Sequence, residues 1–514
     1  MGRLGRAGRC ALPAVAVMLA ACSPPAATQP GAVATAVAAA AVQAGGGDRG
    51  PHVCDHPESG PDQPPVGAIT IDPIMPGELG TKTAAAPPGS TFWLAPGRHS
   101  LGPGAYAQVI PKDNDTFVGA PGAVLDGDGV NNYAFTGKAV GVHITHLTVQ
   151  GFRAPRDEGV VNHDSADGWV IAHDVIQGNS GAGVMAGAQE QVRDSCLRDN
   201  GQYGLNAYQS GDHITGLVVD DDEITGNDVD AWEARVPGCG CTGGAKFWAV
   251  NGADIQHNWI HANRGPGLWA DTDNNDFLIS DNVITDNDAA AVIYEISYNL
   301  TLRDNDIEHN NLVNGRTYAA RGDGFPVAAV YLSESGGEQG IPARTDLIDV
   351  HDNNFRDNWG GVTAWENPDR FCNSPANTST GYCTRLVPDA HMCAQPAIAV
   401  QPLYDRCRWR TQQVSVHDNV FVVDGPLRCA AAARNGLLSG FGTYPDWSPY
   451  KGRVIEDAIT FGQDDVWHDN TYRGPWQFVV HSADQVVPPQ VWQAAPYNQD
   501  SGSTFGDWGK PDAC

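Results

Sequence analysis

Residues 278–287 read LISDNVITDN, and residues 300–310 read LTLRDNDIEHN. In both segments aliphatic residues alternate with polar ones, and an asparagine ends the segment. Related segments occur at 192–200 (VRDSCLRDN) and at 348–358 (IDVHDNNFRDN). A motif that recurs along a chain in this way indicates a repeat architecture.

Seven asparagines end successive copies of the motif: Asn179, Asn200, Asn227, Asn263, Asn287, Asn310 and Asn358. Three residues before each asparagine stands an apolar residue: Ile176, Leu197, Ile224, Ile260, Ile284, Ile307 and Phe355. Eight residues before each stands another: Ile171, Val192, Val219, Ile255, Ile279, Leu302 and Val350. An eighth copy contains Val416, Asn419, Phe421 and Asp424. Because both positions stay apolar in every copy, we predict that they face a common core.

The seven asparagines are separated by 21, 27, 36, 24, 23 and 48 residues. The short intervals suit one coil of a β-solenoid built from short strands, and the long intervals suit the same coil carrying a loop. Helical repeats fit poorly, because the apolar groups are strand-sized and Gly, Asn and Asp separate them. Asparagine tolerates the left-handed backbone of a sharp corner, and stacked asparagines can hydrogen-bond from coil to coil.

These segments resemble the parallel β-helix repeats of the pectate-lyase-like superfamily. The resemblance covers roughly residues 90–480 and implies an all-β fold, a right-handed parallel β-helix (β-solenoid) with loop insertions. It does not imply one activity, because the family includes polysaccharide lyases, glycoside hydrolases, uronan epimerases, phage tailspikes and adhesins. The polygalacturonase motifs are not present as a set, and residues 466–469 (VWHD) only echo the pectate-lyase motif WIDH.

The N-terminus has the features of a signal peptide over residues 1–21. Three arginines precede an apolar run at 10–20, which is the charged and hydrophobic order of an export signal. The sequence LAAC at 19–22 resembles the lipobox of bacterial lipoproteins, which implies cleavage before Cys22 and lipidation of Cys22. The alternative is an ordinary secretory signal in which Cys22 has no special role.

Residues 22–48 are rich in Ala, Pro and Gly, so we predict a flexible linker behind the lipidated cysteine. Residues 49–514 are then a single β-helix domain. We expect an extracellular monomer that is anchored to the bacterial cell membrane only through the lipid, because no later segment is long and apolar enough to span a bilayer.

Ten cysteines follow Cys22: Cys54, Cys196, Cys239, Cys241, Cys372, Cys383, Cys393, Cys407, Cys429 and Cys514. An even number in an exported protein predicts up to five disulfides. Five of the ten lie between residues 372 and 429, which indicates a Cys-rich insertion near 367–411. Cys239 and Cys241 are expected to pair with other cysteines, because a bridge across one residue closes a strained ring. They also lie too close together for a usual zinc pair.

The chain has 514 residues, 31 of them basic and 60 acidic, for a net charge of −29. Loss of the three signal-peptide arginines would take the charge to −32. This balance argues against a nucleic-acid partner, which needs a basic face. It also favours a neutral glycan over a polyuronate, unless a metal ion intervenes. Hydrophobic residues make up 41% of the chain, enough for a core, and the 60 Gly and 35 Pro indicate a turn-rich β protein.

A second short strand follows the corner after each asparagine. Its copies read GLNAY (204–208), GAKFW (244–248), GLWAD (267–271), AVIYE (291–295), AVYLS (329–333) and GVTAW (361–365). Alternate side chains of a strand face opposite sides. The predicted inward residues are Leu205, Ala245, Leu268, Val292, Val330 and Val362. The predicted outward residues are Asn206, Tyr208, Lys246, Trp248, Trp269, Asp271, Ile293, Glu295, Tyr331, Ser333, Thr363 and Trp365.

This alternation predicts a candidate site on one outer face of the solenoid. Lys246, Asp271 and Glu295 are expected in register or nearly so, as the catalytic groups. Tryptophan faces pack well against sugar rings, so the three tryptophans of this face are candidates for substrate binding: Trp248, Trp269 and Trp365. The acidic residues near them are further candidates: Asp273, Glu366, and Asp230 and Glu233 in the preceding loop. The simpler interpretation is a solvated acidic surface, and insertions are tolerated anywhere on a solenoid.

Three functions remain open for a polysaccharide or oligosaccharide partner. A glycoside hydrolase would use Asp271 and Glu295 as paired carboxylates whose repulsion separates their pKa values, and it requires no cofactor. A polysaccharide lyase or uronan epimerase would use Lys246 as the base, with Ca²⁺ on the alternating oxygens of residues 271–276 (DTDNND). A non-catalytic glycan-binding or adhesive protein would use the tryptophans alone.

Overall fold

The computed structural model describes residues 50–208, 214–375, 383–424, 427, 429–440 and 445–506. The predictions of a signal peptide, of lipidation at Cys22 and of a linker lie outside these residues. Within them, no helix has both the length and the apolar character needed to cross a membrane.

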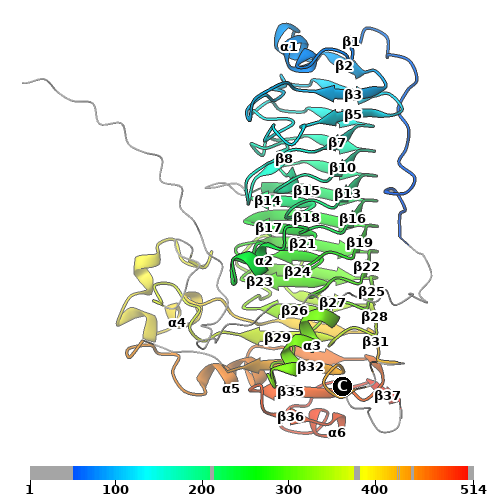
Figure 1. Cartoon of the computed structure of the whole chain (residues 1–514). Coiled ribbons are helices and arrows are strands. Elements are labelled where there is room, and N and C mark those ends of the chain that lie inside the picture. Colours follow the sequence, from blue (N-terminus) through cyan, green and yellow to red (C-terminus); the bar gives the residue numbers. More distant parts are fainter. Residues whose placement is uncertain are drawn as a thin grey trace, which may run out of the picture.

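Three long sheets, each contributing about one strand per coil, form an elongated stack with the N-terminal coils at one end and the C-terminal coils at the other (Figure 1). The pairs within the sheets are parallel, except that β35 and β36 run antiparallel at the C-terminal end. The first sheet contains β1 (Ile69–Ile71), β2 (Thr91–Leu94), β4 (Thr116–Gly119), β6 (His143–Thr145), β9 (Val170–Ala172), β12 (Gln191–Arg193), β15 (Ile214–Asp220), β18 (Val250–Gln256), β21 (Asn275–Ser280), β24 (Tyr298–Arg303), β27 (Ile348–His351), β30 (Val414–His417) and β33 (Val466–His468).

The second and third sheets complete each coil. The second sheet contains β3 (Gly97–Ser100), β5 (Ala123–Asp126), β7 (Thr148–Gln150), β10 (Val175–Gln177), β13 (Cys196–Arg198), β16 (Glu223–Thr225), β19 (Trp259–His261), β22 (Val283–Thr285), β25 (Asp306–Glu308), β28 (Asn354–Arg356), β31 (Val420–Val422), β34 (Thr471–Arg473) and β37 (Thr504–Gly506). The third sheet contains β8 (Gly159–Val161), β11 (Ala182–Met185), β14 (Leu205–Tyr208), β17 (Ala245–Trp248), β20 (Leu268–Ala270), β23 (Val292–Glu295), β26 (Val330–Ser333), β29 (Val362–Glu366), β32 (Arg434–Ser439), β35 (Gln477–His481) and β36 (Val486–Val487).

Short helices lie at the ends of the stack and in the insertions. They are α1 (Glu78–Ala85), α2 (Trp232–Arg235), α3 (Leu312–Ala320), η1 (Ala390–Cys393), η2 (Ala397–Ala399), α4 (Leu403–Arg406), α5 (Val454–Phe461) and α6 (Pro489–Trp492). The insertion that carries η1, η2 and α4 projects from the side of the stack between β29 and β30 (Figure 1). This arrangement confirms the predicted all-β parallel β-helix with loop insertions.

The repeated apolar positions form the core, as predicted. Ile255, Ile279 and Leu302 pair in register on consecutive strands of the first sheet and are at most 2% exposed. Ile260 and Ile284 do the same on the second sheet and are fully buried. One apolar column per sheet therefore runs through the interior and stacks each coil on the next.

The asparagines form a buried hydrogen-bonded ladder at the corner between the second and third sheets. The Nδ2 of each donates to the Oδ1 of the next along a chain of seven, at 2.9–3.1 Å: Asn179, Asn200, Asn227, Asn263, Asn287, Asn310 and Asn358. A parallel ladder runs at the corner between the first and second sheets: Asn258, Asn282, Asn305, Asn353, Asn419 and Asn470. Each amide thus meets partners above and below, which satisfies groups that are costly to bury unpaired.

Residues just after the strands of the first sheet adopt left-handed backbone. Asp281, Asp304 and Asp352 have φ of 59°, 56° and 53°, a conformation that asparagine and aspartate tolerate best among residues with a side chain. This explains why Asp and then Asn follow the apolar residues of the motif.

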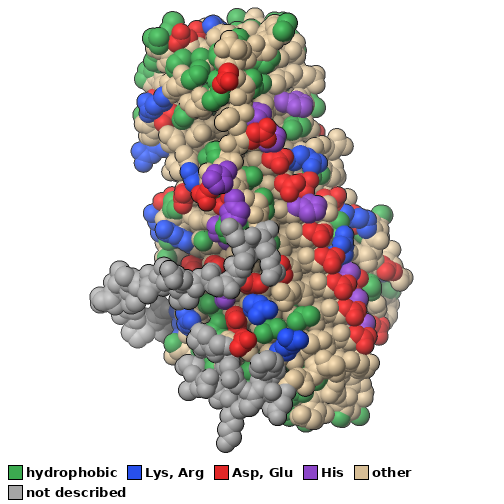
Figure 2. Space-filling view, turned by 90° about the vertical axis from the view of Figure 1, so that its right-hand side faces the viewer, with side chains coloured by type: hydrophobic (Ala, Val, Ile, Leu, Met, Phe, Trp, Pro, Cys, Tyr) green, Lys and Arg blue, Asp and Glu red, His purple; other side chains and the backbone are tan. Residues whose placement is uncertain are grey.

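Acidic side chains, with histidine and basic side chains among them, gather along the length of the stack on the face shown in Figure 2.

Four disulfides join described cysteines, and Cys429 is disulfide-bonded as well. The four pairs are Cys54–Cys196, Cys239–Cys241, Cys372–Cys383 and Cys393–Cys407. The prediction that Cys239 and Cys241 pair elsewhere is wrong. Gly240 between them adopts a left-handed φ of 58° and the two Cα atoms lie 5.2 Å apart, within the usual disulfide range.

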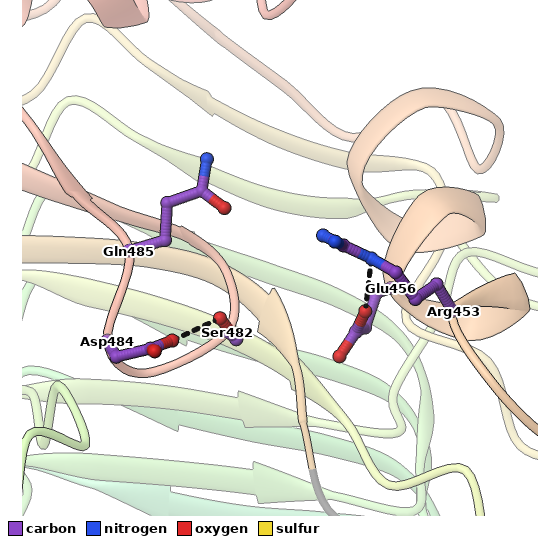
Figure 3. Close-up of a pocket in the computed structure, with 5 residues that line it drawn as sticks. All are labelled: Arg453, Glu456, Ser482, Asp484 and Gln485. Atoms are coloured by element: carbon purple, nitrogen blue, oxygen red, sulfur yellow. Dashed lines mark hydrogen bonds and ion pairs between the residues drawn. The ribbon is translucent and has the colours of Figure 1, made fainter.

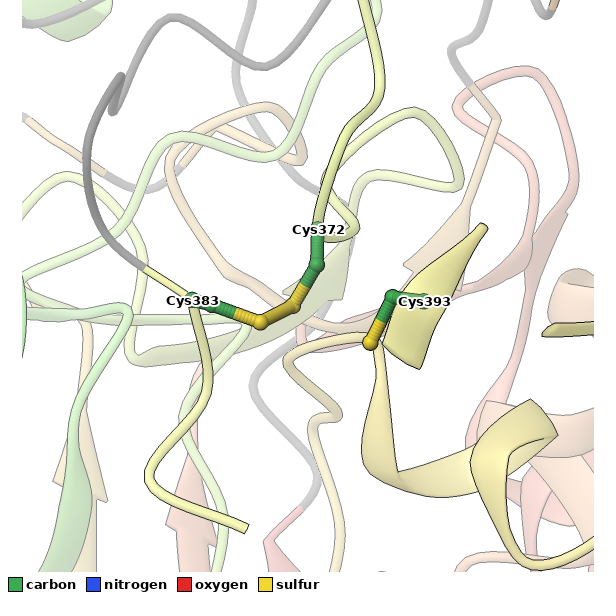
Figure 4. A group of neighbouring side chains, drawn as sticks. All are labelled: Cys372, Cys383 and Cys393. Carbon is green, nitrogen blue, oxygen red and sulfur yellow. A yellow bond between two sulfur atoms is a disulfide. The ribbon is translucent and has the colours of Figure 1, made fainter. Parts of the chain in front are cut away.

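The Cys-rich insertion has a small core of its own. Cys372, Cys383 and Cys393 approach one another (Figure 4), with their sulfur atoms within 4.8 Å. Because these sulfurs belong to the Cys372–Cys383 and Cys393–Cys407 bridges, they are not thiolate ligands. Apolar residues surround them: Phe371, Val387, Ile398, Tyr450 and Ile455.

Replacement of Ile279 by alanine should lower the free energy of unfolding by about 2–5 kcal/mol, because a buried aliphatic side chain is removed from a closely packed interior. Ile74, which is 82% exposed, is the matched control, and Ile74→Ala should change stability by less than about 0.5 kcal/mol. Denaturant unfolding measures both variants. An Ile279→Ala effect as small as the control would contradict its place in the core.

Candidate functional site

The third sheet carries the predicted candidate site on its outer face. Its inward residues are at most 1% exposed, as predicted: Leu205, Ala245, Leu268, Val292, Val330 and Val362. The neighbouring residues along each strand therefore point away from the core. The outer face is largely covered, however, because several of its side chains lie beneath the insertions.

The register of the third sheet is the one that the aligned strand copies predict. Lys246 pairs with Trp269 across β17 and β20, and Trp269 pairs with Ile293 across β20 and β23. Asp271 follows β20 directly, two residues further along, next to Trp248 in the adjoining strand. The long lysine side chain nevertheless bridges this offset, and its Nζ lies 3.0 Å from Asp271 Oδ2.

Three contacts hold the Lys246 ammonium group. Besides the Asp271 ion pair, its Nζ donates to the carbonyl of Gly240 and lies 4.0 Å from the centroid of the Trp269 ring. Gly240 is the residue inside the Cys239–Cys241 bridge, and the Tyr203 hydroxyl donates to the same carbonyl. These three contacts fix the position of the Lys246 Nζ between Asp271, the Gly240 turn and the Trp269 ring.

Asp271 is fixed by its own turn. Its Oδ1 accepts from the backbone N and the Oγ1 of Thr272, at 2.7 and 3.0 Å, while its Oδ2 faces Lys246. The residue is 2% exposed. Both oxygens of this carboxylate are therefore oriented before any ligand arrives.

Glu295 lies at the end of β23, the strand next to β20. Its Oε1 accepts from Arg370 Nη1 at 3.0 Å, and its side chain is 13% exposed. Burial raises the pKa of Glu295 to about 7, the negative charges of Asp271 and Glu334 add to the rise, and Arg370 opposes it. A carboxyl group with this pKa is part protonated at neutral pH, so it can give or take a proton.

Glu334 and Tyr331 complete the cluster around Arg370. The Glu334 carboxylate lies 3.9 Å from Arg370 Nη1 and accepts from the backbone N of Asn367 at 2.7 Å and from the Ser333 hydroxyl. Burial raises the pKa of Glu334. Burial also raises the pKa of Tyr331 well above its usual value, so its hydroxyl stays protonated.

The tryptophans lie on this face, although two of them are covered. Trp248 is 8% and Trp365 is 7% exposed. Trp365 stacks on Tyr331 with ring centroids 6.1 Å apart and meets Phe325 of the insertion after α3 edge-on. Trp269 stays partly exposed beside the charged cluster. Trp248 meets the ring of Tyr208 in the adjoining strand edge-on at 6.1 Å. Of the three tryptophans, Trp269 is the one that reaches solvent.

The structure brings the other predicted residues to different places. Asp273 pairs with Arg385 at 2.6 Å. Glu366 is 1% exposed and bound by Arg408, Thr411 and Gln463, so it serves the packing of the insertion.

The two loop candidates support the site from outside it. Asp230 pairs with Arg235 at 3.0 Å. Glu233 accepts from the backbone N of Gly240 at 3.0 Å and from that of Gly238. Glu233 therefore holds the turn whose Gly240 carbonyl binds Lys246.

The stretch predicted to hold calcium is occupied by protein cations. Asp271 pairs with Lys246, Asp273 with Arg385, and Asp276 with Arg344 at 3.0 Å. In this arrangement a calcium ion would have to displace three positive side chains. Calcium binding at residues 271–276 remains a prediction that a calcium titration tests.

Sequence reasoning missed Arg370 and Glu334. Arg370 belongs to the Cys-rich insertion, outside the repeat, so neither its spacing nor strand alternation marks it. Glu334 follows β26 and has a left-handed φ of 46°. The signal that was available was proximity to a disulfide, because Arg370 stands two residues before Cys372.

A separate hollow of about 450 Å³ lies near the C-terminal end of the stack (Figure 3). Its lining residues are Arg453, Glu456, Ser482, Asp484 and Gln485. Arg453 pairs with Glu456 at 3.0 Å, and the Ser482 hydroxyl donates to Asp484. None of these five described residues is aromatic, so they offer no flat platform for a sugar ring.

Comparison with known proteins bears on the fold. A protein-family model, described as the right-handed β-helix region, matches residues 159–337. A comparison with curated proteins finds no match.

Among solved structures, the chain is similar to the A-module of the Azotobacter vinelandii mannuronan C-5 epimerase AlgE6, at 12% identity and a TM-score of 0.40, over 85% of this chain and 97% of that one. It is similar to a mannuronic acid-specific polysaccharide family 6 lyase from human gut microbiota, at 11% identity and a TM-score of 0.44, over 86% and 91%. It is also similar to an alginate lyase from Paenibacillus sp. str. FPU-7, at 13% identity and a TM-score of 0.31, over 58% and 93%. The β-helix match and the three parallel sheets together confirm a right-handed parallel β-helix.

The raised pKa of Glu295 predicts a pH-dependent stability. The folded pKa of about 7 exceeds the ordinary value of 4.5, so the contribution of this carboxyl is fully present below about 4.5 and is lost as the pH rises through about 7. The free energy of unfolding of the wild type should therefore fall more than that of Glu295→Gln over this interval. Glu308→Gln, on the second sheet of the next coil, should follow the wild type. Equal slopes for wild type and Glu295→Gln would contradict the raised pKa.

Proposed function

We propose that this chain cleaves a polysaccharide, and that its reaction is hydrolysis of a glycosidic bond at Glu295 and Asp271. The observation that carries the proposal is the pairing of two unlike carboxyl groups on neighbouring strands. Glu295 has a pKa of about 7, whereas Asp271 forms an ion pair with Lys246. Glycoside hydrolysis needs this division between a proton donor and a carboxylate.

Each group has a role that follows from its contacts. Glu295, the more exposed of the two, donates its proton to the leaving oxygen of the glycosidic bond. Asp271 is held with one oxygen on Thr272 and the other on Lys246. It attacks the sugar carbon as the glycosidic C–O bond breaks, and water then displaces Asp271 from that carbon while Glu295 takes the proton of the water. Neighbouring strands lie about 4.8 Å apart, which is close to the ~5–5.5 Å separation of retaining pairs.

Lys246 acts in this scheme as a fixed positive charge. A lysine that removes a substrate proton must reach the sugar with its Nζ, whereas the Nζ of Lys246 is engaged by Asp271, the Gly240 carbonyl and the Trp269 ring. This favours hydrolysis over β-elimination with a lysine base. The alternative, a lyase or epimerase, is favoured by one feature, the cations Lys246 and Arg370, since they could neutralise a uronate carboxylate.

The partly exposed ring of Trp269 lies beside the charged cluster, which supports binding of a sugar ring there. The proposal includes an extracellular location and anchoring through Cys22. Release of Cys22→Ser into the medium would support the anchor independently of the chemistry.

A panel of polysaccharides tests the reaction class. We expect the wild type to release reducing ends without the ultraviolet absorbance of an unsaturated uronate. Asp271→Asn and Glu295→Gln should each lower kcat by at least about 10²-fold, the usual worth of acid–base catalysis. Trp269→Ala should mainly raise KM, and Glu308→Gln is the carboxylate control that keeps wild-type kinetics.

The other outcomes assign other functions. Reducing ends together with ultraviolet absorbance would indicate elimination, and binding without cleavage would indicate a glycan-binding protein. Full activity in both carboxylate variants would contradict the assignment of Asp271 and Glu295, and Asp230 and Glu233 would then be the next candidates for the catalytic groups.

The pH dependence of kcat follows from the role of Glu295. Because the acid must be protonated, kcat should fall as the pH rises through about 7. A rate that instead increases through this range would require Glu295 to act as a base. The profile is measured on any polysaccharide that the wild type cleaves.

A further inference from the structure

Two arginines of the Cys-rich insertion contact carboxylates of the candidate site. Arg370 Nη1 lies 3.0 Å from Glu295 Oε1, and Arg385 Nε lies 2.6 Å from Asp273 Oδ1. Arg370 is 8% exposed in its side chain and Arg385 is 18% exposed. Both guanidinium groups therefore lie mostly out of solvent, where a charge pair interacts more strongly than at an open surface.

The Cys372–Cys383 bridge ties these two arginines together. Arg370 stands two residues before Cys372, and Arg385 stands two residues after Cys383. Phe371, between Arg370 and Cys372, is fully buried and meets the ring of Tyr450 at 5.1 Å. The backbone N of Cys372 donates to the carbonyl of Cys407 at 2.8 Å, which joins the bridge to the second disulfide of the insertion.

Arg385 also contacts Tyr298. The backbone N of Arg385 donates to the Tyr298 hydroxyl at 3.2 Å, and its guanidinium group lies 5.8 Å from the centroid of that ring. Tyr298 begins β24, directly after the coil that carries Glu295. The insertion therefore contacts the β-helix at Glu295 through Arg370, and at Asp273 and Tyr298 through Arg385.

We propose that Arg370 is a positioning residue that orients the Glu295 carboxyl, and that the Cys372–Cys383 disulfide holds Arg370 in place for this role. The chemical meaning of this inference rests on the proposed function, since Glu295 is the proton donor there. The inference makes the disulfide part of the site. An oxidising compartment would then be a requirement for full activity, and a dithiol reductant that opens the bridge would loosen Arg370 from Glu295.

The charged groups that face Glu295 come from four elements. They are Arg370 from the insertion, Asp271 after β20, Lys246 on β17 and Glu334 after β26. The two carboxylates disfavour a negative charge on Glu295, and the two cations favour it. Of the cations, Arg370 is the one in direct contact with Glu295. Its removal should therefore raise the pH at which Glu295 titrates.

The test follows the titration of Glu295 without any substrate. Glutamate carboxyl groups are labelled with ¹³C, and the Glu295 resonance is identified by its loss in Glu295→Gln. In Arg370→Gln the midpoint should rise by about 1 pH unit or more, the usual effect of losing an opposite charge in contact. Arg370→Lys should restore part of the shift, and Cys372→Ser combined with Cys383→Ser should raise the midpoint as Arg370→Gln does.

Two controls separate this effect from loss of charge or of any disulfide. Arg385→Gln removes the same charge from the same insertion, and Cys54→Ser combined with Cys196→Ser removes a bridge far from the site. Both should leave the midpoint at the wild-type value. An unchanged midpoint in Arg370→Gln, or in the Cys372–Cys383 variant, would overturn the inference.

The kinetic profile separates this inference from the proposed function. On a cleaved polysaccharide, the upper limb of the kcat profile should move to higher pH in Arg370→Gln together with the midpoint. If the midpoint moves but Glu295→Gln keeps full activity, the positioning inference stands and the proposed function fails. If Glu295→Gln is inactive and the midpoint stays, the proposed function stands and the positioning inference fails.

Discussion

Hydrogen bonds between buried asparagine side chains align one coil with the next throughout the middle of this β-helix. Each amide donates to the asparagine of the following coil and to a backbone carbonyl, as Asn263 does to Asn287 and to Ile224. An amide buried without such partners would cost free energy, so a coil cannot slip by a residue without leaving several of them unpaired. The ladder therefore fixes which residues of neighbouring strands lie side by side.

The candidate site depends on this alignment. β20 and β23 are adjacent because their coils are stacked by Asn263, Asn287 and Asn310. Because these strands are adjacent, Asp271 and Glu295 lie side by side. For the same reason the Lys246 side chain can contact Asp271, which stands two residues beyond its own partner Trp269. The asparagine ladder lies on one side of the sheet and the longer loops lie on the other. Together they form a scaffold that can hold carboxylates close to one another despite their repulsion.

That proximity has a chemical consequence. Three carboxylates and two cations share a largely dry space: Asp271, Glu295, Glu334, Lys246 and Arg370. Lys246 neutralises Asp271, which leaves two carboxylates to one arginine. Burial raises the pKa of Glu295 to about 7, and the charges of Asp271 and Glu334 add to the rise. A proton donor at neutral pH thus arises from burial together with the excess of carboxylates.

The repeat could be predicted from the sequence because each coil repeats the same physical requirements. Apolar residues at fixed distances from an asparagine identified the core, and strand alternation placed Lys246, Asp271 and Glu295 on one face. Aligning the strand copies also predicted their register, in which Trp269 stands level with Lys246. The cover over Trp365 comes from Phe325 of an insertion, and Arg370 also lies outside the repeat, so neither leaves a periodic signal in the sequence.

The most direct test of the site is a crystal structure of Glu295→Gln with an oligosaccharide from a polysaccharide that the wild type cleaves. We expect a glycosidic oxygen within hydrogen-bonding distance of the introduced amide, an adjoining sugar carbon facing Asp271, and a sugar ring against Trp269. A sugar bound elsewhere, for example in the hollow beside Arg453 and Gln485, with no contact at residue 295, would contradict it.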